Sequence, residues 1–195
     1  MKAAVFSLLL AVVSLAEASP FSVLSKAMSL RAPASSETCG NTADLVPLFQ
    51  MYDTAKTVHY YTADDSQVTA TLQEGVYAFT GVAALVFPTA ELSTVPFFCL
   101  INAKATSYFF TTSETERSNA LTAAGYSDCG ITGYIYPTQV CGSVPLYRAH
   151  FIAANTDYLY TISAADRDNA IENQGFTDEG IAGYVIELAS GIIIN

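Results

Sequence analysis

Four short patterns of apolar and polar residues recur three times along the chain, in the same order each time. The first is Val-Pro followed by apolar or aromatic residues, and it starts at Val46, Val95 and Val144. The second is a run that ends in threonine, at residues 59–62, 108–111 and 158–161. Each copy then contains a glycine and closes on an apolar stretch; these glycines are Gly75, Gly125 and Gly175. Because self-similarity at a fixed period indicates internal repeats, we expect repeats over residues 46–94, 95–143 and 144–191.

Each copy predicts the order strand, strand, helix, strand. The first two patterns are rich in β-branched and aromatic residues and are separated by polar turn residues, which is typical of a β-hairpin. The helix that follows should start at an N-cap, with Gln67 or Glu116 three residues later as in a capping box and Asp166 as a weaker version in the third copy. The N-cap residues are Asp64, Ser113 and Ser163. The glycine after each helix fits the left-handed position that ends helices, and the closing apolar stretch predicts a third strand.

One such unit is too small to bury its aromatic face alone, so the copies must pack on one another. We therefore expect an α+β protein with three β-β-α-β repeats in a closed, pseudo-threefold arrangement around a shared aromatic core, forming a single domain over residues 46–195. A β-trefoil, which also has three repeats of this size, is the alternative. Trefoil repeats consist only of strands, so the predicted helices count against it.

The beginning of the chain predicts secretion. Met1 and Lys2 form a short positive segment, residues 3–15 are predominantly apolar, and Ala16-Glu17-Ala18 fits a small-x-small cleavage rule. The apolar run is too short to span a bilayer, so residues 1–18 are interpreted as a secretory signal peptide. Residues 19–45 are predicted to be an arm or a pro-segment rich in serine and alanine. We expect a secreted, extracellular protein.

Charge and motifs exclude several classes of function. The formal net charge is −10, from 18 acidic and 8 basic side chains. Nucleic acids and anionic lipids both require basic surfaces, so neither nucleic acid nor a membrane is an expected partner. His59 and His150 are the only histidines and occupy non-equivalent repeat positions, so we expect no metal site. No cofactor fingerprint or nucleophile motif occurs, so we expect no cofactor and no enzyme activity. The adjacent Asp178 and Glu179 resemble the acid/base pair of a glycoside hydrolase, but neighbours on a strand point apart, and we expect Arg148 to be a structural partner of Glu179.

Four cysteines in a secreted chain predict two disulfides with three possible connectivities. The repeat alignment chooses among them. Cys99 and Cys129 occupy positions that in the third copy hold a complementary pair, Arg148 and Glu179. In the first copy the same positions hold Gln50 and Thr80, which can form a hydrogen bond. If these positions touch in every copy, the disulfides are Cys99–Cys129 and, by elimination, Cys39–Cys141.

The aromatic runs supply the candidate ligand-binding residues. Because strand side chains alternate, Tyr60, Phe109 and Leu159 share one face, which we expect to be core. The opposite face carries residues that either join the core or bind a ligand, and the pattern leaves both open. These candidates are His59, Tyr61, Tyr108, Tyr158 and Tyr160. Tyrosine combines an apolar face with a polar group, which suits sugar rings or a protein surface.

The combined blocks resemble an uncharacterised secreted repeat family of fungi and bacteria with the pattern PLYR…HFYTTSAAER…EGIAGYV. The matching residues are 144–148, 160–161, 163–167 and 178–185. In bacteria, similar domains are appended to secreted hydrolases of cell walls and polysaccharides. The resemblance implies a non-catalytic protein that binds glycan or cell wall. The alternative is a secreted interaction or effector protein whose repeats present loops to another protein, and a glycoside hydrolase is a distant third.

Overall fold

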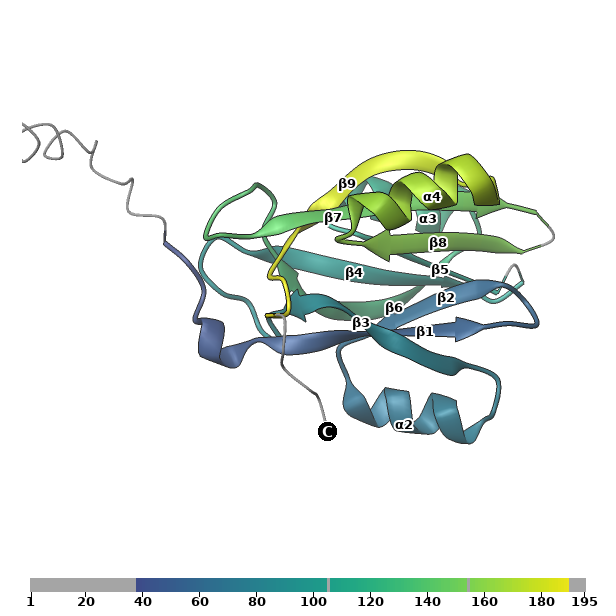
Figure 1. Cartoon of the computed structure of the whole chain (residues 1–195), viewed down its shortest axis with the longest axis horizontal. Helices are drawn as coiled ribbons and strands as arrows, with labels where there is room; N and C mark the ends of the chain where they lie inside the picture. The colour runs from purple at the N-terminus through teal and green to yellow at the C-terminus, as the bar shows by residue number, and fades with distance from the viewer. Residues whose placement is uncertain (1–37, 105, 154, 190–195) are drawn as a thin grey trace, which may run out of the picture. The chain divides into compact units, whose positions relative to one another are not determined.

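The structure is a computed structural model that describes residues 38–104, 106–153 and 155–189 (Figure 1). The predicted signal peptide, most of the predicted arm and residues 190–195 lie outside the described residues. A short 3-10 turn, η1 (Thr42–Asp44), comes before the first strand. Among the described residues, no helix has the length and apolar character needed to cross a membrane.

Three units with the same element order follow one another along the chain. The first unit contains β1 (Val46–Asp53), β2 (Val58–Thr62), α2 (Asp65–Gln73) and β3 (Ala78–Val86). The second contains β4 (Val95–Asn102), β5 (Ser107–Thr111), α3 (Glu114–Ala123) and β6 (Ser127–Ile135). The third contains β7 (Val144–Ile152), β8 (Thr156–Thr161), α4 (Ala164–Gln174) and β9 (Thr177–Val185). Each unit is a three-stranded antiparallel sheet with its first strand in the centre.

The α+β class expected from the sequence is wrong. The chain is mostly β, with 47% of the described residues in strands and 22% in helices. The physical reason is that the helices contribute little to the core: α2 buries no residue, whereas α3 and α4 bury one alanine each, Ala120 and Ala170. The three β-β-α-β units fit the expected order, but the closed pseudo-threefold arrangement is not shown. The alternative β-trefoil does not fit either, since each unit contains a helix.

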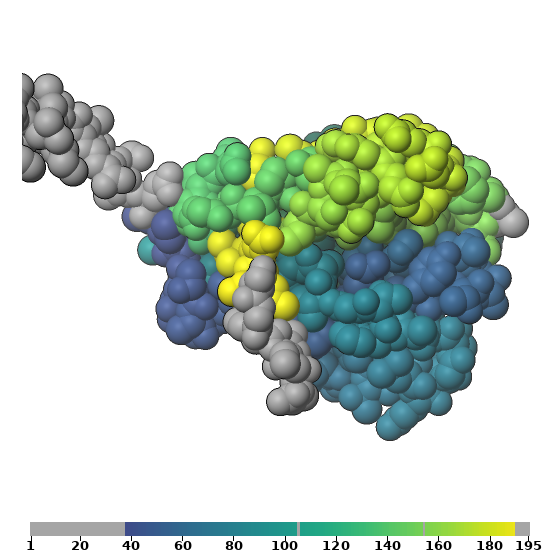
Figure 2. All heavy atoms as spheres, viewed as in Figure 1, coloured from purple at the N-terminus to yellow at the C-terminus, as the bar shows by residue number. Residues whose placement is uncertain are grey.

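Backbone pairing connects the ends of the three closing strands. Leu85 pairs with Ile186, Phe87 with Tyr134, and Tyr136 with Tyr184, each through two backbone hydrogen bonds. The sheets come close at these points because β6 and β9 carry glycine there, Gly133 and Gly183. A Cβ atom on Gly183, for example, would lie 2.5 Å from Cδ1 of Ile135. Figure 2 shows the first unit (blue to teal) and the third (green to yellow) in contact along a continuous surface.

The core is built from equivalent positions of the three units. Tyr61, Phe110 and Tyr160 are at most 1% exposed, and each ring meets the other two edge to face, with centroids 5.3–5.8 Å apart. Leu48, Phe97 and Leu146, one from each central strand, are fully buried around them. The aromatic face that the sequence left undecided is therefore core at these positions.

Both disulfides join the cysteines that the repeat alignment pairs. Cys99 and Cys129 connect β4 to β6, with their Cα atoms 5.1 Å apart. Cys39 and Cys141 are 102 residues apart in sequence and connect the segment before η1 to the turn before β7. Within the described residues there is no free cysteine.

Candidate functional site

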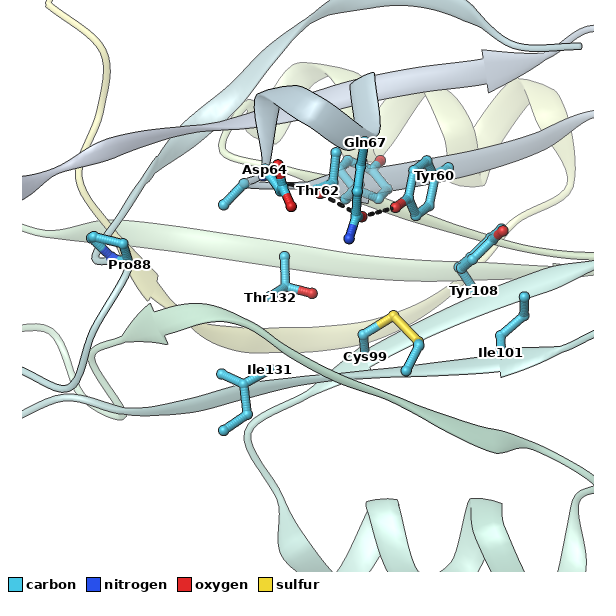
Figure 3. A pocket seen from close by; sticks show the side chains of 13 residues that line it. Tyr60, Thr62, Asp64, Gln67, Pro88, Cys99, Ile101, Tyr108, Ile131 and Thr132 are labelled. Carbon is cyan, nitrogen blue, oxygen red and sulfur yellow. Dashed lines mark hydrogen bonds between the residues drawn. A yellow bond between two sulfur atoms is a disulfide. The ribbon is translucent and has the colours of Figure 1, made fainter. Parts of the chain in front are cut away.

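A hollow of about 490 Å³ lies between the first and second units (Figure 3). This volume falls within the range of small-molecule sites. The first unit supplies one wall, made of the end of β2 and the start of α2. The second supplies the other wall, made of β4, β5 and β6. We call it the first groove; the residues that matter below are Tyr60, Asp64, Gln67, Cys99, Tyr108 and Thr132.

The side chain of Gln67 extends into the first groove because Thr62 takes over its capping role at the start of α2. In a capping box, the third helical residue accepts the N–H of the N-cap. Here Thr62 Oγ1 accepts the N–H of Asp64 at 3.1 Å instead. The side-chain oxygen of Gln67, Oε1, accepts hydrogen bonds from the hydroxyls of Tyr60 and Thr62. The side chain is thus held over the groove rather than folded back onto its own helix.

In the other two units a threonine also accepts the N–H of the N-cap residue in place of the third helical residue. The expected reciprocal capping boxes therefore do not form. Thr111 accepts the N–H of Ser113, and Thr161 accepts the N–H of Ser163, both at 3.0 Å. The serine half of the box is present, since each serine hydroxyl accepts the N–H three residues later. The third helical residue of each unit is therefore available to face the neighbouring unit.

The first groove presents a donor and an acceptor side by side. Figure 3 shows the Gln67 side-chain nitrogen directed toward the space between Asp64 and Thr132, and this nitrogen has no hydrogen-bond partner among the described residues. Asp64 Oδ1 accepts from the hydroxyl and N–H of Ser66, which lowers the pKa of the Asp64 carboxyl. The carboxylate is therefore ionised at neutral pH, and its other oxygen is available as an acceptor.

Tyr60 and Tyr108 form the aromatic part of the first groove, and Tyr77, which is not among the lining residues, packs beside Tyr60. The rings of Tyr60 and Tyr108 come from different units and lie 4.5 Å apart, and Tyr77 lies 5.9 Å from Tyr60. Burial raises the pKa of all three hydroxyls. They stay protonated at neutral pH and can donate hydrogen bonds. The Cys99–Cys129 disulfide forms the wall opposite Gln67 (Figure 3).

Between the second and third units, an arginine lies where the first groove has Cys99. Arg148 is 8% exposed and donates two hydrogen bonds to Glu116, at 2.9 and 3.0 Å. Its Nε lies 2.7 Å from Glu179, and its guanidinium lies 5.1 Å from the centre of the Phe109 ring. The hydrogen bonds from Arg148 lower the pKa of Glu116. Glu116 occupies the position of Gln67, so this interface is closed by ion pairs between its own side chains.

The five candidate residues do not form one site. Tyr108 lines the first groove, whereas Tyr158 packs on Phe109, with ring centroids 5.0 Å apart. His59 lies between the first and third units, where its ring nitrogen Nδ1 is 2.7 Å from Asp157. Tyr61 and Tyr160 lie in the core, because they are 1% exposed and their hydroxyls bond to backbone groups of the neighbouring unit; Tyr61 also lines the first groove.

Sequence reasoning missed three residues of the first groove. Tyr60 was expected in the core, but it is only half-buried and faces Tyr108. Asp64 and Gln67 were interpreted only as helix caps. The signal that identifies them is the threonine two residues before the N-cap, which is present in all three units and removes the need for Gln67 in capping. Within the described residues, no cluster of three His, Cys, Asp or Glu side chains could hold a metal ion.

Comparison with known families gives one match: residues 47–186 match the family model described as a domain of unknown function, DUF5648. The matched segment begins in β1 and ends just after β9, so it includes all three units. No curated protein and no solved structure matches the chain.

Proposed function

The chain belongs to the DUF5648 family, a domain family of unknown function, and we propose that it is a secreted, non-catalytic protein that binds saccharides of a glycan or cell wall in the first groove. The observation that best supports this proposal is the Tyr60–Tyr108 pair of rings beside the Gln67 amide and the Asp64 carboxylate. A sugar has apolar C–H faces and hydroxyls that both donate and accept hydrogen bonds. Aromatic faces with a few fixed polar groups are complementary to both.

A binding role fits the groove better than glycoside hydrolysis. Hydrolysis of a glycosidic bond generally requires two carboxyl groups on opposite sides of the bond. Among the described residues that line the first groove, Asp64 is the one carboxylate. Glu116 and Glu179 both lie within ion-pair distance of Arg148, so both carboxylates are already engaged. Secretion is supported by the two disulfides, since these bonds persist mainly in oxidising compartments.

The test is saccharide binding by the full chain and a Gln67→Glu variant. Glutamate keeps the oxygen that accepts from Tyr60 and Thr62 but replaces the N–H donors with a second acceptor; Glu116 shows that a glutamate fits this position. Retention on insoluble chitin, β-glucan and peptidoglycan, with a soluble glycan array, would identify the ligand. We expect at least a tenfold loss of affinity in the variant, the cost of losing one well-placed hydrogen bond.

Gln73→Glu is the matched control, because it makes the same chemical change at an exposed position at the end of α2. It should bind like the unmodified chain, and both variants should unfold at a similar temperature. Retention on no polysaccharide, together with an empty glycan array, would refute the proposal. If the Gln67→Glu variant binds saccharide as tightly as the unmodified chain, the ligand does not bind in this groove.

A further inference from the structure

We infer that the chain has a second saccharide-binding groove, between the third and first units and centred on His59. Two adjoining hollows of about 240 and 220 Å³ lie there, and His59 and Gln174 border both. The inference rests on the proposed function for the class of ligand, but its location and residues are independent of the first groove.

Asp157 fixes His59 in one orientation and one tautomer. Asp157 is 2% exposed, and its two oxygens hold the Nδ1 and the backbone N–H of His59, both at 2.7 Å. A carboxylate only accepts hydrogen bonds, so Nδ1 carries a proton, and in the neutral form of the imidazole Nε2 is an acceptor. The ring of Tyr52, with its centroid 4.7 Å away, packs on the imidazole. Nε2 has no hydrogen-bond partner among the described residues.

The larger hollow provides a polar wall opposite His59. Asp166, Asn169 and Gln174 line it from α4, and Gln50 lines it from β1. Asp166 is the third helical residue of its unit, released from capping by Thr161. Unlike Glu116, its carboxylate has no cationic partner in the part of the chain that the structure describes. Asn169 Oδ1 accepts a hydrogen bond from Asn173, so this wall offers sugar hydroxyls the Asn169 amide N–H groups and the Asp166 carboxylate.

The smaller hollow provides the apolar wall. Tyr52, Phe151 and Phe176 line it, and the rings of Phe151 and Phe176 lie 5.6 Å apart. His59 stands between this aromatic surface and the polar wall, so a sugar ring placed against the aromatics can donate a hydroxyl hydrogen to Nε2.

The internal alignment of the units supports the same ligand class in both grooves. Asp166 takes the place of Gln67, His59 takes the place of Tyr108, and Thr161 takes the place of Thr62. The corresponding space between the second and third units holds Arg148. Two grooves on one rigid scaffold would let the protein hold a polymer at two points, which raises retention well above the affinity of either site.

The first experiment measures stoichiometry. The full chain is titrated calorimetrically with tetrasaccharides of N-acetylglucosamine, β-1,3-glucose and β-1,4-glucose. We expect two sites per chain, reduced to one by His59→Gln and to one by Gln67→Glu, with no binding in the double variant. If His59→Gln does not fold, Asn169→Ala, at an exposed position on α4, removes a contact of the same groove.

The outcomes separate this inference from the proposed function. A single site that Gln67→Glu abolishes and His59→Gln leaves intact would overturn the second groove and keep the first. A single site that His59→Gln abolishes and Gln67→Glu leaves intact would establish the second groove and refute the first. No binding of any tetrasaccharide, together with an empty glycan array and no retention on the three polysaccharides, would refute both.

A second readout tests the role of Asp157 as a positioning residue. Nitrogen NMR shifts of the His59 ring should show a protonated Nδ1 and an unprotonated Nε2 in the unliganded chain at neutral pH. Bound saccharide should shift Nε2 selectively. A protonated Nε2, or a ring unchanged by a saturating ligand, would overturn the assignment of His59 as the acceptor.

Discussion

The hydroxyl of Tyr160 binds both backbone groups of Phe110: it accepts the N–H at 2.8 Å and donates to the carbonyl oxygen at 2.7 Å. Tyr61 does the same to the backbone of Tyr160, at 2.9 and 3.2 Å. Both target strands, β5 and β8, are edge strands of their own sheets. Each tyrosine therefore satisfies backbone groups that an edge strand leaves unpaired.

Tyr160→Phe should destabilise the fold by about 1–3 kcal/mol. The substitution leaves the N–H and carbonyl of Phe110 buried without a partner, and such groups cost about this much. Denaturant unfolding followed by fluorescence measures the change. Tyr134→Phe is the control, because its hydroxyl makes no hydrogen bond in the described part of the chain, and it should change stability by less than about 0.5 kcal/mol. Equal effects of the two variants would contradict the role assigned to the hydroxyl.

Phe110→Tyr should be tolerated and should stabilise the fold by about 0.5–1.5 kcal/mol, the net value of a hydrogen bond. Phe110 occupies the third equivalent position, and its ring meets Tyr61 edge to face at 5.8 Å. We expect a hydroxyl there to reach the backbone of Tyr61, by analogy with the Tyr61 and Tyr160 hydroxyls at the equivalent positions. Phe97→Tyr, at a fully buried position stacked on Phe110, should instead destabilise. A decrease of more than about 1 kcal/mol in the unfolding free energy of Phe110→Tyr would show that the contact between Phe110 and β2 has no room for a hydroxyl.

Glu116 should make stability depend on acid pH. Hydrogen bonds from Arg148 hold the pKa of Glu116 below its ordinary value in the folded chain. A carboxyl with a depressed folded pKa stabilises the fold above its unfolded pKa, about 4.3, and this contribution is lost as the pH falls through the folded value. The destabilisation caused by Glu116→Gln should thus be largest near neutral pH and should shrink below about pH 4.

Urea unfolding at several pH values from 3 to 7 measures this dependence. The control is Glu114→Gln in the same helix, whose side chain is 70% exposed and pairs only with Arg117 at the surface. Its effect should be small throughout, as for most surface ion pairs. A Glu116→Gln effect that is the same at pH 3 and pH 7 would rule out the ion pair as its cause.

Removing the Cys39–Cys141 disulfide should cost about 4–5 kcal/mol, because it closes a long loop and strongly restricts the unfolded chain. Its two cysteines are 102 residues apart, against 30 for Cys99–Cys129. Thermal unfolding of the Cys39→Ala/Cys141→Ala double variant measures the loss. Because residues 38–45 precede all strands, the three sheets should still form, and near-native circular dichroism at low temperature is expected. A variant without cooperative unfolding would show that this bond is needed for the core itself.

The order of elements and the cysteine pairing could be predicted because they depend on local pattern. Turn residues, caps and terminal glycines mark each element within a few residues, and the third copy supplies Arg148 and Glu179 where the second has Cys99 and Cys129. The class was wrong because helix length in sequence says little about burial: α2 has nine residues and buries none.

Which face of the second strand in each unit is buried could not be predicted, since alternation separates two faces but does not say which one the other units cover. Both faces of β2 and β5 carry aromatic residues, so Tyr60 and Tyr61 look equivalent in sequence. Contacts with the other units decide: Tyr61 meets Phe110 and Tyr160, whereas Tyr60 meets Tyr108 at the edge of a groove. Gln67 was missed because its spacing from Asp64 matches a capping box, and the competing hydrogen bond of Thr62 is not part of that pattern.

In each unit the threonine two residues before the N-cap accepts the N-cap N–H, so the start of the helix does not depend on the side chain of the third helical residue. In the first and third units, the third helical residue is not needed for capping, so Gln67 and Asp166 can be exchanged without loosening the helix. If the two proposed grooves bind saccharides, a small library at these two positions should change ligand preference at each groove separately. The scaffold would serve as a starting point for engineered recognition proteins whose specificity changes while their stability does not.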